Sequence, residues 1–139
     1  MRIVQATTAI FEARDDADDR FFIFGTLTGG VLWFDVVSRL PDGTKGRTRG
    51  REFFDALMKH FGVRVRIIEG RWDRLGGLTT NLDLFNQATL VLPPEQAALV
   101  ATKTGQWADD YGFSNVTVTR LEPLHAIGQY ETVRVNFSK

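Results

Sequence analysis

Two runs of β-branched and aromatic residues constrain the fold of this chain more than any other feature. They are RFFIFGTL, within residues 20–28, and VLWFDVVSRL, residues 31–40, and Gly29-Gly30 separates them. Such residues favour strands, and a Gly-Gly pair supplies the positive φ angles of a tight hairpin turn. The sequence therefore predicts a hairpin. An apolar run at residues 2–13 predicts a preceding strand, which extends the hairpin to an antiparallel meander.

The rest of the chain alternates between helical and strand patterns. A helix is predicted over about 50–61, where large apolar residues recur at helical spacing and Gly62 supplies the stop. Alternation over residues 63–69 predicts a half-buried strand. Further predicted elements are a helix at 81–88, a helix from Pro93-Pro94 to about Tyr111 that bends near Gly105, and a final hairpin of strands at 115–121 and 132–137.

This order is strand-strand-strand-helix-strand-helix-helix-strand-strand. It predicts an α+β fold with a mixed, largely antiparallel sheet of about six strands, flanked by about three helices. A length of 139 residues fits one domain, and no repeat or linker interrupts residues 1–139.

Composition narrows the kinds of site that the chain can carry. It has no Cys and two His, so thiolate chemistry is excluded and no metal site is expected. Lys plus Arg and Asp plus Glu number 17 each, so only local clusters bear on an anionic partner. The acidic run from Asp15 to Asp19 predicts a solvated turn, because the Gly and the distal Glu of a calcium loop are missing.

No apolar run approaches the length of a membrane span, and we expect no membrane partner. The N-terminal residues alternate and turn acidic early, unlike a signal peptide. The expected location is the cytoplasm, or the chain is delivered as part of a secreted effector.

The basic loop, Lys45-Gly46-Arg47-Thr48-Arg49-Gly50-Arg51, leads directly into the helix predicted at 50–61. Cations are unfavourable at a helix N-terminus, which already carries partial positive charge. Backbone N–H groups and Arg side chains form an anion cradle at such a place. We therefore predict that Arg47, Arg49, Gly50 and Arg51 bind a phosphate-bearing small molecule or nucleic acid, with no cofactor specified. A solvated loop and a contact with a partner are the alternatives.

A second candidate cluster, Glu69-Gly70-Arg71-Trp72-Asp73, follows the strand predicted at 63–69. Arg71 and Trp72 are candidate ligand-binding residues, because an indole stacks on a base or another ring. The alternative is that Trp72 packs into the core.

Two polar segments have both structural and functional interpretations. Around residues 79–87, a Thr or Asn caps a helix, and Asp83, Asn86 and Gln87 form either a polar face toward a ligand or a solvated surface. At Gly105, a glycine inside a helix indicates a close approach, most simply of a packed backbone. His125, in the connection between the last two strands, is a candidate general base.

Five segments in this order resemble a domain found at the C-terminal ends of large secreted bacterial polymorphic toxins. They are REFFDALMKHFG, EGRW, NLDLFNQAT, AALVATKTGQWADDYGFSNVTV and YETVRVNFSK, and the resemblance covers about residues 47–139. It implies a context, that of an effector domain, and no particular reaction.

The order of elements is also similar to the core of the Gcn5-related N-acetyltransferases. Those proteins hold the pyrophosphate of acetyl-CoA with an Arg/Gln-x-x-Gly-x-Gly/Ala loop before a helix. The stretch from Arg47 to Glu52 matches the Arg and the first Gly, while Glu52 replaces the second small residue. This resemblance implies Tyr111 as a catalytic acid and Glu69 as a base.

Three functional hypotheses follow, and the sequence leaves open whether the chain is an enzyme. The first is an effector domain acting on a phosphate-bearing ligand (a nucleotide, coenzyme or nucleic acid) in a cleft shared by the basic loop, Arg71 and Trp72. The second is a non-enzymatic binding or interaction module. The third is an acetyl-CoA-dependent acyltransferase-like domain.

Overall fold

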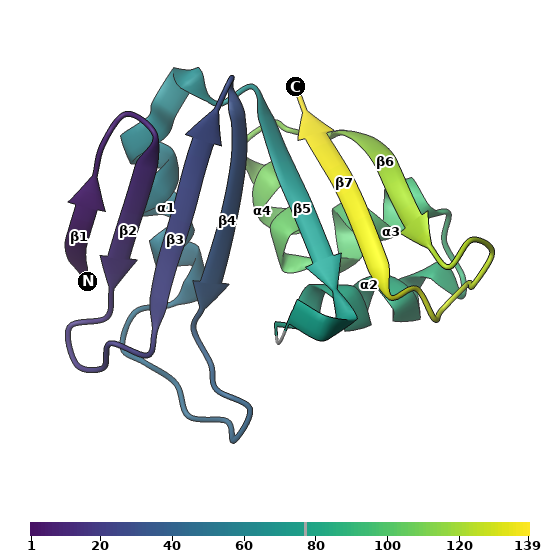
Figure 1. Cartoon of the computed structure of the whole chain (residues 1–139), viewed down its shortest axis with the longest axis horizontal. Coiled ribbons are helices and arrows are strands. Elements are labelled where there is room, and N and C mark those ends of the chain that lie inside the picture. Colours follow the sequence, from purple (N-terminus) through teal and green to yellow (C-terminus); the bar gives the residue numbers. More distant parts are fainter. Residues whose placement is uncertain (77) are drawn as a thin grey trace. The chain divides into compact units, whose positions relative to one another are not determined.

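The computed structural model of the chain describes residues 1–76 and 78–139. The chain forms two compact units, residues 1–66 and residues 67–139. Figure 1 shows strands backed by helices in each. Seven strands and four α-helices are assigned among the described residues. The α+β class and the largely antiparallel pairing are thus confirmed.

The first unit is an antiparallel meander with one helix. Its strands are β1 (Arg2–Ala6), β2 (Ile10–Arg14), β3 (Phe22–Thr28) and β4 (Val31–Val37), and its helix is α1 (Gly50–Phe61). The predicted hairpin is confirmed: Thr28 pairs with Val31, and Gly29 and Gly30 have φ angles of 57° and 80°.

The strand predicted at residues 2–13 is two strands. Thr7 makes the turn between them: its backbone N–H donates to the carbonyl of Ile10, and its hydroxyl accepts from the N–H groups of Ala9 and Ile10. A threonine side chain that bonds its own backbone in this way favours a turn over a continuous strand.

The helix α1 covers one face of the meander, as its apolar spacing predicts. Phe53, Phe54 and Leu57 are fully buried, and α1 packs against β2, β3 and β4. The ring centroid of Phe54 lies 5.2 Å from that of Phe34 in β4, and Leu57 lies against Gly25 in β3. Burying a side chain of this size stabilises a fold by about 1.5–3 kcal/mol. This packing fixes the start of α1, and with it the basic loop, against the sheet.

The second unit places three helices on one face of a three-stranded sheet. Its elements are β5 (Ile67–Asp73), the 3₁₀ turn Arg74–Gly76, α2 (Thr80–Thr89), α3 (Pro94–Ala101), α4 (Lys103–Asp110), β6 (Asn115–Glu122) and β7 (Thr132–Ser138). A further 3₁₀ turn, Gly62–Arg64, follows α1 in the first unit. The sheet order is β5-β7-β6, and both strand pairs are antiparallel. The final hairpin is therefore confirmed.

Two predicted boundaries in the second half of the chain are wrong. The strand predicted at residues 63–69 begins at Ile67 and runs to Asp73. The chain after α1 forms a 3₁₀ turn at Gly62–Arg64 first, and this turn leaves Val63 fully exposed. The helix predicted to run from Pro93-Pro94 to Tyr111 is two helices divided at Thr102. None of the helices among the described residues is long and apolar enough to cross a bilayer.

Candidate functional site

The basic loop is held in place by a turn that the sequence marks with Pro41-Asp42-Gly43. The backbone N–H of Leu40 donates to the Thr44 carbonyl, and that of Gly43 donates to the Leu40 carbonyl. The turn brings Arg39 and Lys45 opposite each other in an isolated antiparallel bridge. Two cations from positions six residues apart therefore lie side by side at one end of the loop.

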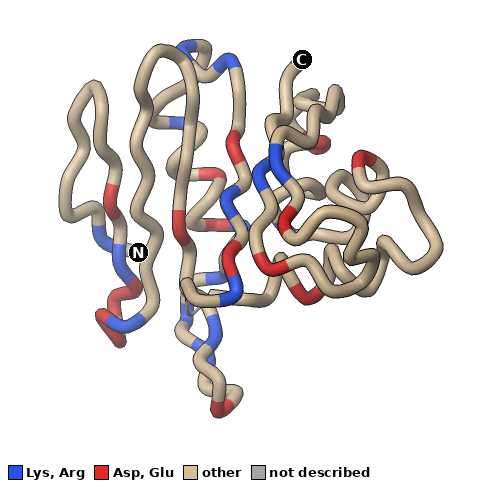
Figure 2. Tube along the Cα trace, turned by 45° about the vertical axis from the view of Figure 1, so that its right-hand side comes forward, with Lys and Arg blue, Asp and Glu red and all other residues tan. Residues whose placement is uncertain are grey.

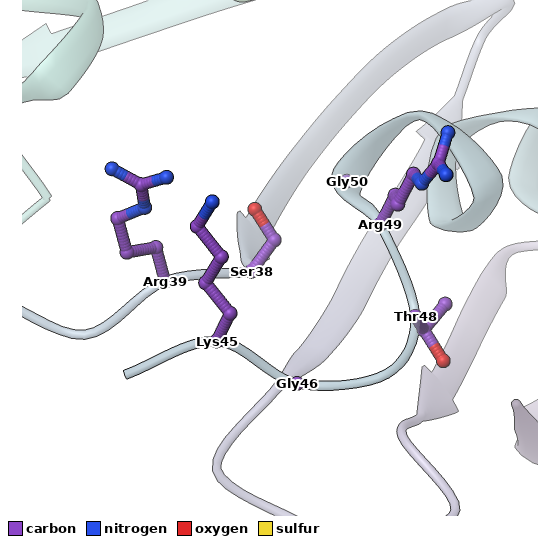
Figure 3. Close-up of a pocket in the computed structure, with 7 residues that line it drawn as sticks. All are labelled: Ser38, Arg39, Lys45, Gly46, Thr48, Arg49 and Gly50. Carbon is purple, nitrogen blue, oxygen red and sulfur yellow. The ribbon is translucent and has the colours of Figure 1, made fainter. Parts of the chain in front are cut away.

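These residues line a hollow in the first unit. It has a volume of about 210 Å³ and is lined by Ser38, Arg39, Lys45, Gly46, Thr48, Arg49 and Gly50. Figure 3 shows Ser38, Arg39 and Lys45 on one side of the hollow, with Arg49 and Gly50 at the start of α1 on the other. The lining thus combines cations, a hydroxyl and glycine backbone.

Among the described residues, the cationic side chains that line the hollow form no ion pairs with carboxylates. Within the described part of the chain, the side chains of Arg39, Lys45 and Arg49 have no ion-pair partner. Arg51 differs, because its Nε lies 2.8 Å from Oδ1 of Asp55, one helical turn on. Arg47 is exposed and does not line the hollow.

The buried carboxylate of Asp15 holds the basic loop in place through a hydrogen bond to its backbone. Oδ1 of Asp15 accepts a hydrogen bond of 2.6 Å from the backbone N–H of Thr48, and Oδ2 accepts from the N–H groups of Ala17 and Asp18. Burial raises the pKa of Asp15, but these hydrogen bonds outweigh it and lower the pKa from its ordinary 3.8 to about 2. The prediction of a fully solvated acidic turn is therefore wrong for Asp15.

Gly46 lets the loop lie against the core. A Cβ atom there would stand 2.8 Å from the ring of Phe21 and 3.2 Å from Cγ of Asp15. Both neighbours are buried, so neither can move aside cheaply. Asp15 and Gly46 together determine where the cations of the loop emerge.

Glu52 has a structural role at the start of α1. Its carboxylate accepts a hydrogen bond of 3.2 Å from the backbone N–H of Arg49, as in a capping box. A carboxylate there also complements the helix dipole. It therefore occupies the position where a phosphate would meet the helix N-terminus, and it leaves the Arg39–Lys45 side of the hollow for an anion.

The second predicted cluster lies within β5 and not in a loop. Trp72 is 5% exposed, and its ring centroid lies 5.7 Å from that of Phe85, so the ring packs in the core. Arg71 points from the other face of the strand and forms an ion pair with Glu69. The ring of Trp72 is therefore not presented to a ligand.

The remaining predicted catalytic residues are scattered. Tyr111 ends α4, on the side of the sheet that the helices cover, whereas Glu69 lies on the opposite face of β5. His125 is exposed in the connection between β6 and β7, with a positive φ of 61°. The structure of the second unit does not bring these side chains together.

A sequence signal for the site lies in the turn at residues 41–43, which has a cation on each side. A tight turn brings the residues on its two sides next to each other. Arg39 and Lys45 flank the turn and are therefore paired in the bridge. Of the residues predicted for the loop, Arg49 and Gly50 line the hollow, and Arg47 and Arg51 do not.

Comparison with known proteins adds no family to this description. No protein-family model matches the chain, and no curated protein matches it with significant similarity. The two resemblances seen in the sequence therefore stay predictions.

Proposed function

We propose that the hollow formed by residues 38–50 binds a phosphate-bearing ligand, such as a nucleotide or a coenzyme. The observation that carries the proposal is that Arg39, Lys45 and Arg49 line one hollow and form no ion pair with a carboxylate of the described residues. Unpaired guanidinium and ammonium groups attract phosphate and donate charge-assisted hydrogen bonds to it.

The residues that line the hollow favour binding over catalysis. None of the seven is a carboxylate or an imidazole, the side chains that most often transfer protons in enzymes. The Ser38 hydroxyl and the backbone of Gly46 and Gly50 add hydrogen-bonding groups. The hollow would therefore hold and orient a ligand, which agrees with the hypothesis of a binding module.

The acyltransferase hypothesis has less support from the loop. Glu52 stands where acetyl-CoA-binding loops have a small residue, and its carboxylate already bonds the Arg49 N–H. An anionic side chain at this point would repel a pyrophosphate seated on the helix N-terminus. Acetyl-CoA is therefore a useful comparison ligand, since the proposal requires the phosphate to contact Arg39 and Lys45 and does not require a pyrophosphate seated on the backbone of the helix N-terminus.

The proposal is tested by titrating the protein with inorganic pyrophosphate, ADP and acetyl-CoA while recording its unfolding temperature. A ligand at one hundred times its Kd stabilises the folded state by about 2.7 kcal/mol, a readily measured shift. The double variant Arg39→Gln/Lys45→Gln should weaken binding at least tenfold, because each lost charge-assisted hydrogen bond contributes about 1.5–3 kcal/mol.

Arg47→Gln is the matched control, since Arg47 lies in the same loop but outside the hollow. It removes one positive charge and should change the affinity little. The proposal would be refuted if none of the three ligands raised the unfolding temperature, or if Arg47→Gln weakened binding as much as either single substitution, Arg39→Gln or Lys45→Gln.

The effector context is a separate proposal that rests on the resemblance to toxin C-terminal domains. It is tested by expressing the chain in a bacterial cytoplasm and following growth. Growth arrest that the Arg39→Gln/Lys45→Gln variant relieves would link the context to the hollow, and normal growth with the intact chain would contradict it.

A further inference from the structure

The face of the second unit's sheet that lies away from its helices is almost entirely polar. The buried residues of β5 and β7, such as Trp72 and Val135, face the helices, and their neighbours in sequence face the other way. Three paired rows of this open face are Glu69, Asn136 and Thr117; Arg71, Arg134 and Arg120; and Asp73, Thr132 and Glu122. A fourth row, which contains the apolar residue of this face, is Ile67, Ser138 and Asn115.

The middle row consists of three arginines on neighbouring strands. Arg71 pairs with Arg134 across β5 and β7, and Arg134 pairs with Arg120 across β7 and β6. Figure 2 shows Lys or Arg segments side by side on these strands, bordered by acidic ones. Like charges placed directly opposite each other in a sheet are destabilising. Along β5 and β6, carboxylates flank the row and offset part of this repulsion, as the ion pairs of the row show.

Each guanidinium group is held by a carboxylate at the edge of the row. Arg134 Nη1 lies 3.1 Å from Oδ1 of Asp73, Arg71 Nε pairs with Glu69, and Arg120 Nε lies 2.7 Å from Oε1 of Glu122. Hydrogen bonding to Arg120 lowers the pKa of Glu122, so this carboxylate stays charged in its supporting role.

These ion pairs use only some of the donors of the row. In the described structure, Arg134 engages Nη1 alone and Arg120 engages Nε and Nη2, so Nε and Nη2 of Arg134 and Nη1 of Arg120 stay available. The side chains of Arg71 and Arg120 are 47% and 51% exposed, and that of Arg134 is 25% exposed. Arg134 and Arg120 thus present oriented N–H groups to solvent.

We propose that this arginine row, Arg71, Arg134 and Arg120, binds the phosphate backbone of a single-stranded nucleic acid. Strands lie about 4.8 Å apart, so the row spans about 10 Å, more than one phosphate group occupies. The flanking Thr117, Thr132 and Asn136 supply hydroxyl and amide groups for sugar and phosphate oxygens. None of the residues in these rows is aromatic, so contact is with the backbone and independent of sequence.

The test measures binding of fluorescein-labelled U12 and dT12 oligonucleotides by anisotropy as the salt concentration varies. Single strands give a slope of log K against log salt of about −0.7 for each neutralised phosphate, so three contacts give a slope of about −2. Arg134→Gln and Arg120→Gln should each weaken binding by about tenfold at 50 mM salt and reduce the slope by about 0.7.

Arg74→Gln is the matched control, because Arg74 is also in the second unit but pairs with Asp83 of α2. It should leave both the affinity and the slope unchanged. Circular dichroism spectra and unfolding temperatures of all variants, compared with those of the parent chain, separate loss of binding from loss of folding.

Several results would overturn the proposal. The first is that neither oligonucleotide binds at 50 mM salt. The second is that the Arg74→Gln control loses as much affinity as Arg134→Gln or Arg120→Gln. The third is that polyglutamate competes as effectively as an unlabelled oligonucleotide, which would indicate an acidic protein partner. The Arg39→Gln/Lys45→Gln variant of the first unit separates the two proposals. It should bind the oligonucleotides normally. If this variant alone lost binding, the nucleic-acid site would be the hollow and not the arginine row.

Discussion

Asp15 supports the basic loop from inside the first unit, although its own carboxylate touches none of the three cations of the hollow. It bonds the backbone of Thr48, Ala17 and Asp18, so one side chain orders both the acidic turn and the segment before α1. A carboxylate that accepts several N–H bonds is stabilised in its charged form. Its protonation state is therefore coupled to the position of the loop.

Stability of the first unit should depend on pH through this residue. The folded pKa of about 2 lies below the ordinary 3.8, so the unfolded chain takes up the proton first as pH falls. The stabilising contribution is complete above about pH 4 and is lost as pH falls toward 2. Urea unfolding between pH 6 and pH 2 should show this loss, and Asp15→Asn should be less stable at pH 6 and lack this part of the pH dependence.

Asp16→Asn provides the comparison for that experiment. Its side chain is 63% exposed and, among the described residues, pairs with the N-terminal amine at the surface, so the substitution should leave the acid transition in place. An unchanged pH profile in Asp15→Asn would show that Asp15 does not fasten the loop.

Single residues also show which features can be predicted from local sequence and which depend on tertiary contacts. The apolar spacing of α1 repeats every turn, so its buried face could be predicted from local pattern. Asp15 stands beside three other aspartates in a five-residue run, and only the tertiary approach of Thr48 distinguishes it. The sequence pattern predicts a loop around Trp72 because it predicts the strand to begin at Val63. The strand β5 begins at Ile67 instead, and no nearby residue marks this shift.

At the scale of elements, polar side chains of α2 connect this helix to the segment before β7 and to the start of α4. Asn86 donates to the carbonyl of Tyr130 at 2.9 Å and accepts from its N–H at 2.8 Å. Thr89 accepts from the N–H of Gly128, and Asn81 accepts from the N–H of Lys103 at the start of α4. The polar residues Asn81, Asn86 and Thr89 therefore hold other backbone segments, which leaves Asn86 no role toward a ligand.

Asn86→Ala should destabilise the second unit. The substitution leaves the N–H and carbonyl of Tyr130 without partners in a buried place, where each unsatisfied group costs about 1–3 kcal/mol. Urea unfolding measures the loss, and amide exchange at Tyr130 should accelerate. Gln87→Ala, at the next and exposed position of α2, should change stability by less than about 0.5 kcal/mol. Equal effects of the two substitutions would contradict the role given to Asn86.

The break between α3 and α4 shows how a side chain ends one helix and starts another. The hydroxyl of Thr102 donates to the Ala98 carbonyl and accepts from the Gly105 N–H. A Cβ atom on Gly105 would lie 1.9 Å from that same carbonyl oxygen, so the backbone packing predicted for Gly105 is confirmed. The sequence predicts a bend here. The break itself depends on the hydrogen bonds of the Thr102 hydroxyl to backbone groups, and the spacing of apolar residues carries no information about them.

At the scale of the whole molecule, the size of the two units bears on the single-domain prediction. They contain 66 and 73 residues. A unit of this size buries only about 60% of the surface that its unfolded chain exposes, and its stability alone is marginal. We therefore expect the two units to unfold together in one cooperative transition, as a single domain of residues 1–139 would.

Hydrogen exchange of α1 amides tests this expectation with a substitution in the other unit. If unfolding is one transition, Asn86→Ala lowers the free energy of global opening, and the slowest amides of α1 and of β7 should accelerate by the same factor. A loss of 1.4 kcal/mol corresponds to a tenfold acceleration in both. Gln87→Ala should leave both sets unchanged. Acceleration confined to residues 67–139 would show instead that each unit opens by itself. The chain would then consist of two small domains, and the two proposed sites, the hollow and the arginine row, could be studied separately.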